Sequence, residues 1–390
     1  MPRVTLDPAV VAGMVEEAHE AGSVGLDTEF LREKTYRARL CLVQVATRKD
    51  IYLFDPLDGR AAIEEVAKLV ADPAIEVLLH AGRQDLEILY ERFGASPRSI
   101  FDVQIAAGFA GLGASLPYGR LVESITKTTL TKGESYTDWC KRPLTESQLR
   151  YAADDVRYLH VIADRLKDGL TRGDRLEWVR TEMSYLEDVS LYEVDLGEIW
   201  KKVSGRGSLS GKQLSVLREL ARWREEQAIE RDIPRGWVVK DQTLIEVARK
   251  GPSSTAVLKN MRGMVSKEAE RSGRAILDAV TRGQQSEPME SAGRPSRTAQ
   301  MRARTLSGLA DAIVRSRCEA AGIAPELVST RGELESLLTE VFSGSVDEQR
   351  HRLLQEWRRE LAGDAVVALA RGEIAVRSID KPPYIEEVRL

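Results

Sequence analysis

Cysteine, histidine and aromatic residues are all scarce in this chain of 390 residues. There are three cysteines and four histidines, and Phe, Trp and Tyr together make up 6% of the sequence. The cysteines, Cys41, Cys140 and Cys318, lie far apart and fit no spacing that is typical of a metal site. We therefore expect three free thiols in a reducing cytoplasm.

Long hydrophobic runs are also absent. The first 22 residues contain acidic side chains where a secretory signal would need an apolar run, and no stretch is long enough to span a bilayer. We therefore expect no membrane association. With 43% hydrophobic and 30% charged residues, the composition is that of a globular protein, and 390 residues are too many for one compact core.

The net charge of −4 is unusual for a protein that binds nucleic acid, but the charge is unevenly distributed. Residues 1–195 contain 24 Lys or Arg and 33 Asp or Glu, which gives a net charge of −9. Residues 196–290 contain 18 and 13, which gives +5, and residues 291–390 contain 15 of each. An acidic region joined to a basic one suggests a polyanionic partner, although a solvated basic helix face explains such a segment at least as often.

Three short apolar segments follow one another near the N-terminus, at residues 24–30, 38–46 and 51–56. Their length and their apolar or β-branched residues predict strands. Residues 61–72 then show a helical pattern, and residues 77–82 look like a fourth, buried strand. Three adjacent strands followed by strand–helix units predict an α/β domain in which a mixed sheet is flanked by helices.

The rest of the chain has a mostly helical pattern that two polar stretches interrupt. Residues 201–212, rich in glycine and serine, indicate a linker, and residues 283–297 indicate a second, flexible one. The last hundred residues are expected to be helical throughout. We therefore expect an α/β domain at 1–200, followed by two small all-α domains at 208–284 and 298–376.

Asp27 and Glu29 lie at the end of the first predicted strand. Because strand side chains alternate between the two faces, these carboxylates share one face, and Leu26, Thr28 and Phe30 point to the other. Like charges this close together repel each other unless a cation lies between them. An isolated Asp-x-Glu is nonetheless more often a solvated strand end than a functional site.

Asp85 follows the fourth strand, at the start of the next predicted helix. Aspartate is common at this position because its side chain can cap backbone N–H groups, so the position alone does not indicate a ligand. His80, at the end of the same strand, is expected to be a hydrogen-bonded packing residue and not a ligand.

A long helix is expected over residues 145–166. Its apolar stripe consists of Leu149, Ala152, Val156, Leu159, Ala163 and Leu166. Asp155 borders this stripe with Tyr151 one turn earlier on the same side, whereas Asp154 points toward solvent. A carboxylate at the edge of a buried face beside a tyrosine suits a functional site, and a stabilising hydrogen bond between the two explains the pattern equally well.

Asp27, Glu29, Asp85 and Asp155 together fit one kind of chemistry. Hydrolysis of a phosphodiester needs an activated water, neutralisation of the charge on the phosphorane and stabilisation of the leaving oxygen. Two divalent ions about 4 Å apart supply all three, and Mg²⁺ and Mn²⁺ prefer oxygen ligands such as carboxylates. The hydroxyl of Tyr151 can orient the attacking water. The four acids therefore predict a two-metal nuclease site.

Three motifs occur along the chain in the order DTEF (27–30), HAGRQD (80–85) and YAADD (151–155). In type and order they resemble the three exonuclease motifs of the DEDD superfamily. The tyrosine that opens the third motif matches the tyrosine subclass of that superfamily.

Neighbouring residues narrow the resemblance to the ribonuclease D family. Lys132 and residues 137–144 (TDWCKRPL) are similar to that family, which usually has serine at the position of Thr137. Residues 223–263 resemble the HRDC domain, named after helicases and ribonuclease D. Residues 325–361 resemble the family's divergent second copy of that domain.

The resemblance implies a ribonuclease-H-like catalytic domain followed by two HRDC-type helical domains. It implies 3′-5′ release of nucleoside monophosphates from RNA with a free 3′ end, tRNA precursors and other structured RNAs included. It also implies that Asp27 bridges both metal ions, that Glu29 and Asp155 complete the site of the water-activating ion, and that Asp85 supports the second ion. No member of the catalytic set is missing, and no obligate protein partner is implied.

Lys132, Trp139 and Arg142 are candidate RNA contacts in the polar segment just before the third motif. The ring of Trp139 could stack on a terminal base, and the guanidinium of Arg142 could hold a phosphate. The alternative, which we favour for Trp139, is that the ring anchors this loop to the core while Arg142 pairs with an acid.

Two other functions are compatible with parts of the pattern. A DNA 3′-5′ exonuclease would use the same metal chemistry, because only contacts to the 2′-hydroxyl distinguish the substrates. A non-catalytic RNA-binding protein would rely on the basic region alone. Such a protein is expected to lack at least one of the four acids, and all four are present.

Overall fold

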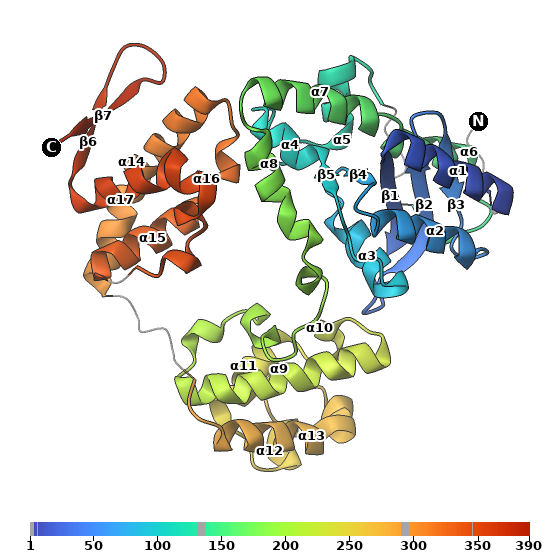
Figure 1. Ribbon diagram of the computed structural model, residues 1–390. Coiled ribbons are helices and arrows are strands. Elements are labelled where there is room, and N and C mark those ends of the chain that lie inside the picture. Colours follow the sequence, from blue (N-terminus) through green and yellow to red (C-terminus); the bar gives the residue numbers. More distant parts are fainter. Residues whose placement is uncertain (1–3, 6, 131–136, 290–295, 345) are drawn as a thin grey trace.

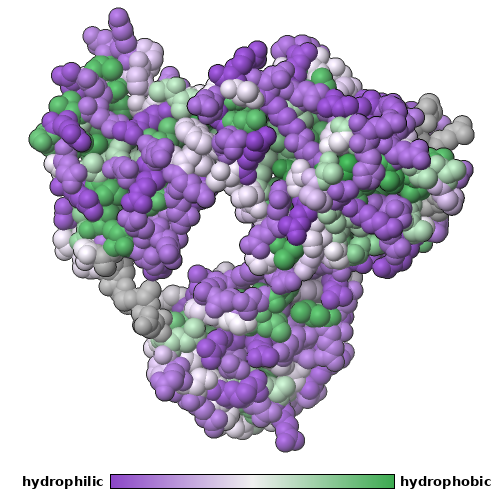
Figure 2. Space-filling model, viewed as in Figure 1, coloured by the Kyte–Doolittle hydropathy of each residue, from purple (hydrophilic) through white to green (hydrophobic). Residues whose placement is uncertain are grey.

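The computed structural model describes residues 4, 5, 7–130, 137–289, 296–344 and 346–390. Three regions follow one another along the chain, an α/β region and two helical regions, and they surround a central opening (Figures 1 and 2). No helix among the described residues is both long enough and apolar enough to cross a membrane.

The α/β region is built on a five-stranded mixed sheet in the order β3-β2-β1-β4-β5. The strands are β1 (Ser23–Leu31), β2 (Arg39–Ala46), β3 (Ile51–Phe54), β4 (Glu76–Leu79) and β5 (Ile100–Asp102). β2 pairs antiparallel with β1 and with β3, whereas β4 pairs parallel with β1 and with β5. The expected mixed sheet is confirmed, and β5, which is only three residues long, is an addition to the four expected strands.

Helices cover both faces of the sheet (Figure 1). They are α1 (Pro8–Ala21), α2 (Arg60–Val70), α3 (Arg83–Phe93), α4 (Val103–Phe109), α5 (Tyr118–Thr126), α6 (Glu146–Arg157), α7 (Leu159–Arg172) and α8 (Leu176–Met183). Leu26 and Val43 on one face share a core with α1 to α3. On the other face, Leu42 packs with Ala152 of α6 and Ala46 with Leu159 of α7. The strand alternation expected from the sequence accounts for this division.

The helix expected over residues 145–166 is in fact two helices. α6 ends at Arg157 and α7 begins at Leu159. At Tyr158 the backbone N–H donates a hydrogen bond to the hydroxyl of Tyr118, 3.3 Å away, which gives this amide a side-chain partner at the break. The sequence pattern does not show the break because the apolar stripe continues across it.

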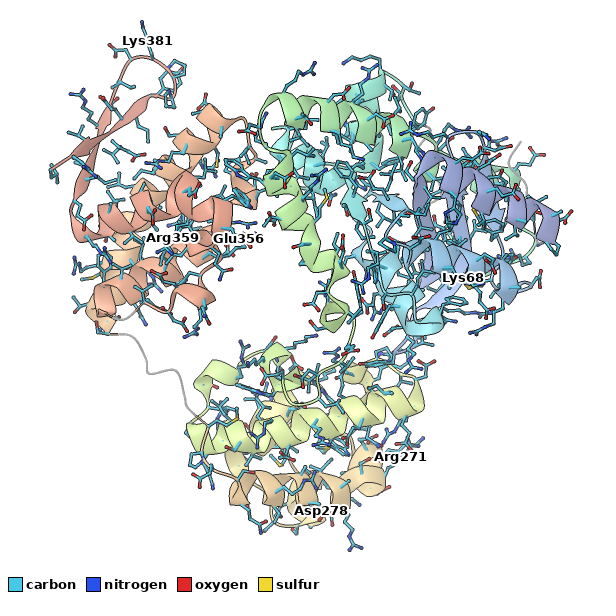
Figure 3. The ribbon with its side chains drawn as sticks, viewed as in Figure 1. Lys68, Arg271, Asp278, Glu356, Arg359 and Lys381 are labelled. Atoms are coloured by element: carbon cyan, nitrogen blue, oxygen red, sulfur yellow. A yellow bond between two sulfur atoms is a disulfide. The ribbon has the colours of Figure 1, made fainter. Side chains whose placement is uncertain are left out.

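The middle region contains α9 (Gly211–Arg231), α10 (Arg235–Val238), α11 (Asp241–Lys250), α12 (Thr255–Lys259) and α13 (Ser266–Gln285). Its core also includes Ile199, Val203 and Leu209 from the stretch that precedes it. The glycine- and serine-rich residues 201–212 are therefore packed against the middle helices in short 3-10 turns, and the expectation of a simple linker there was wrong. Arg271 and Asp278 extend outward from α13, as Lys68 does from α2 (Figure 3).

The last region contains α14 (Arg297–Ala321), α15 (Arg331–Ser343), α16 (Glu356–Arg358) and α17 (Asp364–Arg371), with a π-helical turn over Arg359–Gly363 between the last two. The chain then forms a hairpin of β6 (Ile374–Ser378) and β7 (Ile385–Arg389). The expectation that the last hundred residues are entirely helical was therefore wrong. The hairpin strands are short and only partly buried, so they lack the apolar runs that identified the strands of the first sheet.

The last region packs directly on the first. The ring of Trp357 lies 4.9 Å from that of Phe109 and 5.5 Å from that of Trp178, measured between ring centroids. Beside these rings, Arg358 pairs with Glu182 at 2.6 Å. A single core of buried apolar residues consequently runs through both regions.

Candidate active site

Asp27 and Glu29 lie on the face of the sheet that α6 and α7 cover. Gly25, two residues earlier on the same face, lies so close to α7 that an added Cβ would be 3.2 Å from Cδ1 of Leu159. One carboxylate oxygen from each of Asp27, Glu29 and Asp155 lies within 4.8 Å of the other two. The structure thus brings three of the four predicted acids into one cluster, from a strand and from a helix about 130 residues later in the chain.

Asp85 lies beside this cluster and is held by β1. Its carboxylate accepts a short hydrogen bond from the hydroxyl of Thr28 and another from the Thr28 backbone N–H. These bonds are possible because β4 pairs with β1 only as far as Gly25, which leaves the following edge of β1 for the start of α3. The N-cap of α3 is Gly82, so Asp85 is not the helix-capping residue. The charge of Asp85 raises the pKa of Asp27.

α6 holds Tyr151 and Asp155 in place. The helix begins with a capping box, in which the Thr145 hydroxyl accepts a hydrogen bond from the Gln148 backbone N–H and the Gln148 side-chain oxygen accepts one from the Thr145 backbone N–H. Tyr151 lies one turn before Asp155 on this helix and forms a hydrogen bond with its carboxylate. This bond lowers the pKa of Asp155 and so partly offsets the rise that burial causes. Asp154 pairs with Arg157 at 2.8 Å and is half-buried, so it is less solvated than its position on the helix suggested.

Burial is the largest cause that raises the pKa of all four acids. The pKa of Glu29 rises to about 9, those of Asp85 and Asp155 each rise to about 7, and that of Asp27 rises well above its usual range. Repulsion from the neighbouring carboxylates adds to burial at Asp27 and Glu29. Such a cluster is electrostatically unfavourable unless a cation offsets its charge, and an all-oxygen donor set suits Mg²⁺ or Mn²⁺ better than zinc.

Two further polar residues of the site had no signal in the sequence. Gln44 lies directly across from Asp27 in the β1–β2 ladder, is fully buried, and its carboxamide has no hydrogen-bond partner among the described residues. Burial raises the pKa of the Tyr118 hydroxyl, and the charges of Asp155 and Asp27 add to that effect. Both residues depend on pairings between distant segments, which a motif search cannot reveal. His80 is a packing residue, as expected, since its Nε2 lies 2.9 Å from the Leu116 carbonyl oxygen.

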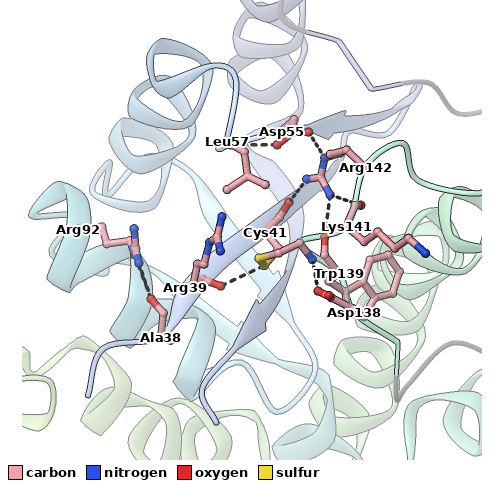
Figure 4. Close-up of a disulfide and its surroundings, with 11 residues drawn as sticks. Ala38, Arg39, Cys41, Asp55, Leu57, Arg92, Asp138, Trp139, Lys141 and Arg142 are labelled. Carbon is pink, nitrogen blue, oxygen red and sulfur yellow. Dashed lines mark hydrogen bonds and ion pairs between the residues drawn. A yellow bond between two sulfur atoms is a disulfide. The ribbon is translucent and has the colours of Figure 1, made fainter. Parts of the chain in front are cut away.

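The three residues predicted as candidate RNA contacts differ in their structural surroundings or lie outside the described residues. Lys132 lies outside the described residues. Trp139 is buried, with 3% of its surface exposed, which favours the anchoring role. The guanidinium of Arg142 pairs with Asp55 and donates to the carbonyl oxygens of Trp139, at 2.7 Å, and Cys41, at 2.6 Å (Figure 4). Either side chain would have to leave these contacts in order to touch RNA.

Cys41 and Cys140 form a disulfide across 99 residues of sequence (Figure 4). The expectation of three free thiols was therefore wrong for this pair, and Cys318 is the free, buried cysteine among the described residues. The reason is a β-bulge between β1 and β2. Glu29 pairs with Leu42 and Phe30 with Leu40, which leaves Cys41 as the extra residue.

Comparisons with known proteins point to the same class of enzyme. A family model described as 3′-5′ exonuclease matches residues 2–171, and the HRDC domain model matches residues 213–280. Ribonuclease D of Gluconacetobacter diazotrophicus is 35% identical over 373 residues, which cover 93% of this chain and 91% of that protein. Ribonuclease D of Jannaschia sp. is 34% identical over 398 residues, which cover 100% of both chains.

A solved structure is similar over nearly the whole chain. The crystal structure of Escherichia coli RNase D, described as an exoribonuclease involved in structured RNA processing, matches with a TM-score of 0.82 and 29% sequence identity. The match covers 95% of this chain and 99% of that one, so it includes both helical regions as well as the α/β region.

Proposed function

The chain belongs to the ribonuclease D family, and on that premise we propose that it trims the 3′ ends of structured RNAs, tRNA precursors among them, with Asp27, Glu29, Asp85, Asp155 and Tyr151 as its catalytic set. It is a 3′-5′ exoribonuclease that releases nucleoside monophosphates with the help of divalent metal ions. The observation that carries the assignment of residues is the partly buried cluster of Asp27, Glu29 and Asp155.

In this proposal the four carboxylates bind the metal ions, and the hydroxyl of Tyr151 orients the attacking water. Asp27 would serve both ions, Glu29 and Asp155 would complete the ligand set of one, and Asp85 would support the other. When bound, two Mg²⁺ or Mn²⁺ ions supply an activated water and offset the charge on the attacked phosphate and on the leaving oxygen. The Tyr151 hydroxyl would orient that water, and its hydrogen bond to Asp155 supports this role.

The substrate assignment rests on charge and on likeness to known proteins. The E. coli protein named above acts in structured RNA processing. Here, an acidic catalytic region repels a polyanion except at its metal site, so the basic residues 196–290 are the candidate support for the body of the RNA. We assign this support to the helical domain at 208–284, because the residues that contain the domain at 298–376 carry no net charge. We expect the enzyme to work in the cytoplasm.

A matched pair of substrates tests the proposal. Purified protein is incubated with a tRNA precursor that carries a short 3′ tail, and with a DNA strand of the same tail sequence, each with Mg²⁺, with Mn²⁺ or with chelator. We expect release of mononucleotides from the RNA tail with either metal and none with chelator. Equal rates on the DNA strand would instead support a general 3′-5′ exonuclease, and binding without cleavage would support a non-catalytic RNA-binding protein.

A further inference from the structure

Trp139 lies between the disulfide and the proposed catalytic tyrosine. The centroid of its ring is 5.9 Å from that of Tyr151, and the two ring planes are inclined at 38°. Its indole N–H has no hydrogen-bond partner among the described residues, so packing alone sets the orientation of the ring. The next residue, Cys140, is covalently bound to Cys41 on β2.

The β-bulge is what allows this bond to form on the face of the sheet that carries the site. Without the extra residue, Cys41 and Leu42 would point to opposite faces. With it, both belong to the same small apolar cluster as Trp139 and Ala152 of α6. The bulge lies directly beside Glu29, so the disulfide joins the strand next to the carboxylates to the loop that leads into α6.

We propose that Trp139 is a positioning residue for Tyr151, and that the Cys41–Cys140 disulfide keeps it in place, so that reduction of this disulfide lowers turnover. The proposal rests on the proposed role of Tyr151 and adds a redox control to the same site. In this role Trp139 acts through its contact with the ring of Tyr151 and not on metal or substrate.

The redox step needs a dithiol reductant. One thiolate of the dithiol attacks the sulfur of one cysteine, the S–S bond breaks, and the other cysteine leaves as a thiolate. The second thiol of the reductant then closes its own disulfide and releases the first cysteine. Two electrons pass to the protein, and the two protons of the dithiol end on Cys41 and Cys140.

Reduction is expected to loosen the loop without releasing it. Arg142 still bonds to the carbonyl oxygens of Trp139 and Cys41 and still pairs with Asp55. At the other end of the loop, Gln148 of α6 donates to the hydroxyl of Thr137 at 3.1 Å. The loss of turnover is therefore expected to be partial, at most the roughly 10²-fold that a displaced catalytic group can cost.

The alternative is that the disulfide only stabilises the fold. In that case its loss lowers the melting temperature and leaves kcat per folded molecule unchanged. A positioning role instead lowers kcat while KM for RNA and the affinity for Mn²⁺ stay the same, because no group that binds either ligand is altered.

The first test compares oxidised and reduced protein. Thiol titration is expected to find one thiol in the oxidised, denatured protein and three after treatment with dithiothreitol. Wild-type kcat on a tailed RNA should fall on reduction, and the Cys41→Ala/Cys140→Ala variant should match the reduced wild type and not respond to the reductant. Cys318→Ala is the matched control, which should keep the response. Three titratable thiols before reduction, or an unchanged kcat after it, would overturn the redox control.

The second test uses Trp139→Leu and the conservative Trp139→Phe in two backgrounds. In the wild-type background, Trp139→Leu should lower kcat by about 10-fold or more, and Trp139→Phe should keep much of the wild-type kcat. In a Tyr151→Phe background, Trp139→Leu should have almost no further effect, since it acts through the missing hydroxyl. Additive losses would refute the positioning role and leave the proposed function intact. If Tyr151→Phe alone left kcat unchanged, the catalytic role of Tyr151 itself would be wrong.

Discussion

Burial and mutual repulsion oppose ionisation of the carboxylates in the folded, metal-free enzyme. Glu29 has a pKa of about 9 in the fold against a usual 4.5, and Asp155 about 7 against 3.8. At a pH between its usual pKa and its raised pKa, each carboxyl group is protonated in the folded state and ionised in the unfolded state. The folded state therefore binds more protons than the unfolded state does. The free energy of unfolding must then fall as the pH rises from about 4.5 to about 9, which is the opposite of an ordinary ion-paired acid.

This sign gives a prediction for chelated protein. Its melting temperature should fall across that pH range, and Mg²⁺ should restore most of the loss at the alkaline end. Replacing Glu29 with Gln should flatten the metal-free profile because it removes the group with the pKa of about 9. Scanning calorimetry in chelating buffer, repeated with Mg²⁺, measures both effects. A metal-free profile that rises with pH would contradict the assigned direction.

The neighbouring aspartates of α6 offer a matched pair of substitutions. Asp155→Asn should lower metal affinity or turnover by at least roughly 10- to 100-fold while folding and RNA binding persist, because one charged ligand is lost without a change in volume. Asp154→Asn should cost little, since it breaks an ion pair with Arg157 that is partly exposed. Single-turnover rates and Mn²⁺ titrations of both variants decide between them, and equal losses would refute the assignment of Asp155.

Tyr151→Phe separates a positioning hydroxyl from a ligand. We expect both metal positions to keep their affinity and turnover to fall by about 10²- to 10⁴-fold, the range for loss of one group that acts on the attacking water. Metal titration and rapid-quench kinetics on a short RNA measure the two quantities. Unchanged single-turnover rates would leave Tyr151 as a packing partner of Trp139.

At the scale of residues, the sequence predicts what local spacing controls. Asp27 and Glu29 share a face because strands alternate, and Tyr151 and Asp155 are neighbours because helices repeat. The bond between Asp85 and Thr28 could not be predicted, since it depends on β4 ending its pairing early. The disulfide between Cys41 and Cys140 likewise depends on a β-bulge that the residue pattern does not predict.

At the scale of elements, the four predicted strands are present in the structure. The strands that the sequence did not predict are short or amphipathic. β5 is three residues long, and the strands of the terminal hairpin are short and only partly buried, so neither carries an apolar run as long as that of β2. At the break between α6 and α7, the Tyr158 N–H bonds to the hydroxyl of Tyr118, which is 40 residues away in sequence. A local sequence pattern does not show such a tertiary contact.

Two glycines test helix packing at this scale. Gly283 of α13 faces α9 so closely that an added Cβ would lie against Cα of Val216 and 2.8 Å from the Ser215 carbonyl oxygen. Gly283→Ala should therefore destabilise the middle region by about 1–3 kcal/mol. Gly169→Ala in α7, where nothing lies within 4 Å, should instead stabilise by about 0.5–1 kcal/mol. Urea titrations measure the free energy of unfolding of both variants. Equal effects of the two substitutions would contradict the close packing of α13 against α9.

At the scale of the whole molecule, the regions are not independent. The N–H groups of Tyr36 and Arg37 each donate to Asp232 of the middle region at 3.1 Å, and the core around Trp357 continues into the first region. Charge and composition could predict separate regions but not these contacts. A chain cut near residue 200 would expose Phe109 and Trp178, so tests of RNA binding are better made with substitutions in the full-length protein.

Three cations of the middle region suit such a test. Lys240, Arg262 and Lys267 are exposed and form no ion pair within the part of the chain that the structure describes, so their charge is available to phosphates. Replacing all three with Gln should weaken binding of a tRNA precursor and leave kcat on a short single strand unchanged, because the carboxylates and Tyr151 are untouched. Each lost phosphate contact should reduce the slope of log affinity against log salt by about 0.7–0.9, so the slope should flatten by roughly 2 to 3.

The control places the same loss of charge on the catalytic region. Arg60, Lys68 and Arg120 are exposed there, and each pairs with a glutamate within one turn of its helix. Replacing these three with Gln changes the net charge by the same amount, so a non-specific effect of charge would weaken RNA binding equally in both triple variants. Binding measured at several salt concentrations, with the folded fraction determined for each protein, separates the two cases. If only the middle-region variant loses affinity and salt dependence, the basic helices hold the RNA body while the metal site of the first region cleaves its end. If neither variant does, the charge asymmetry has no part in binding.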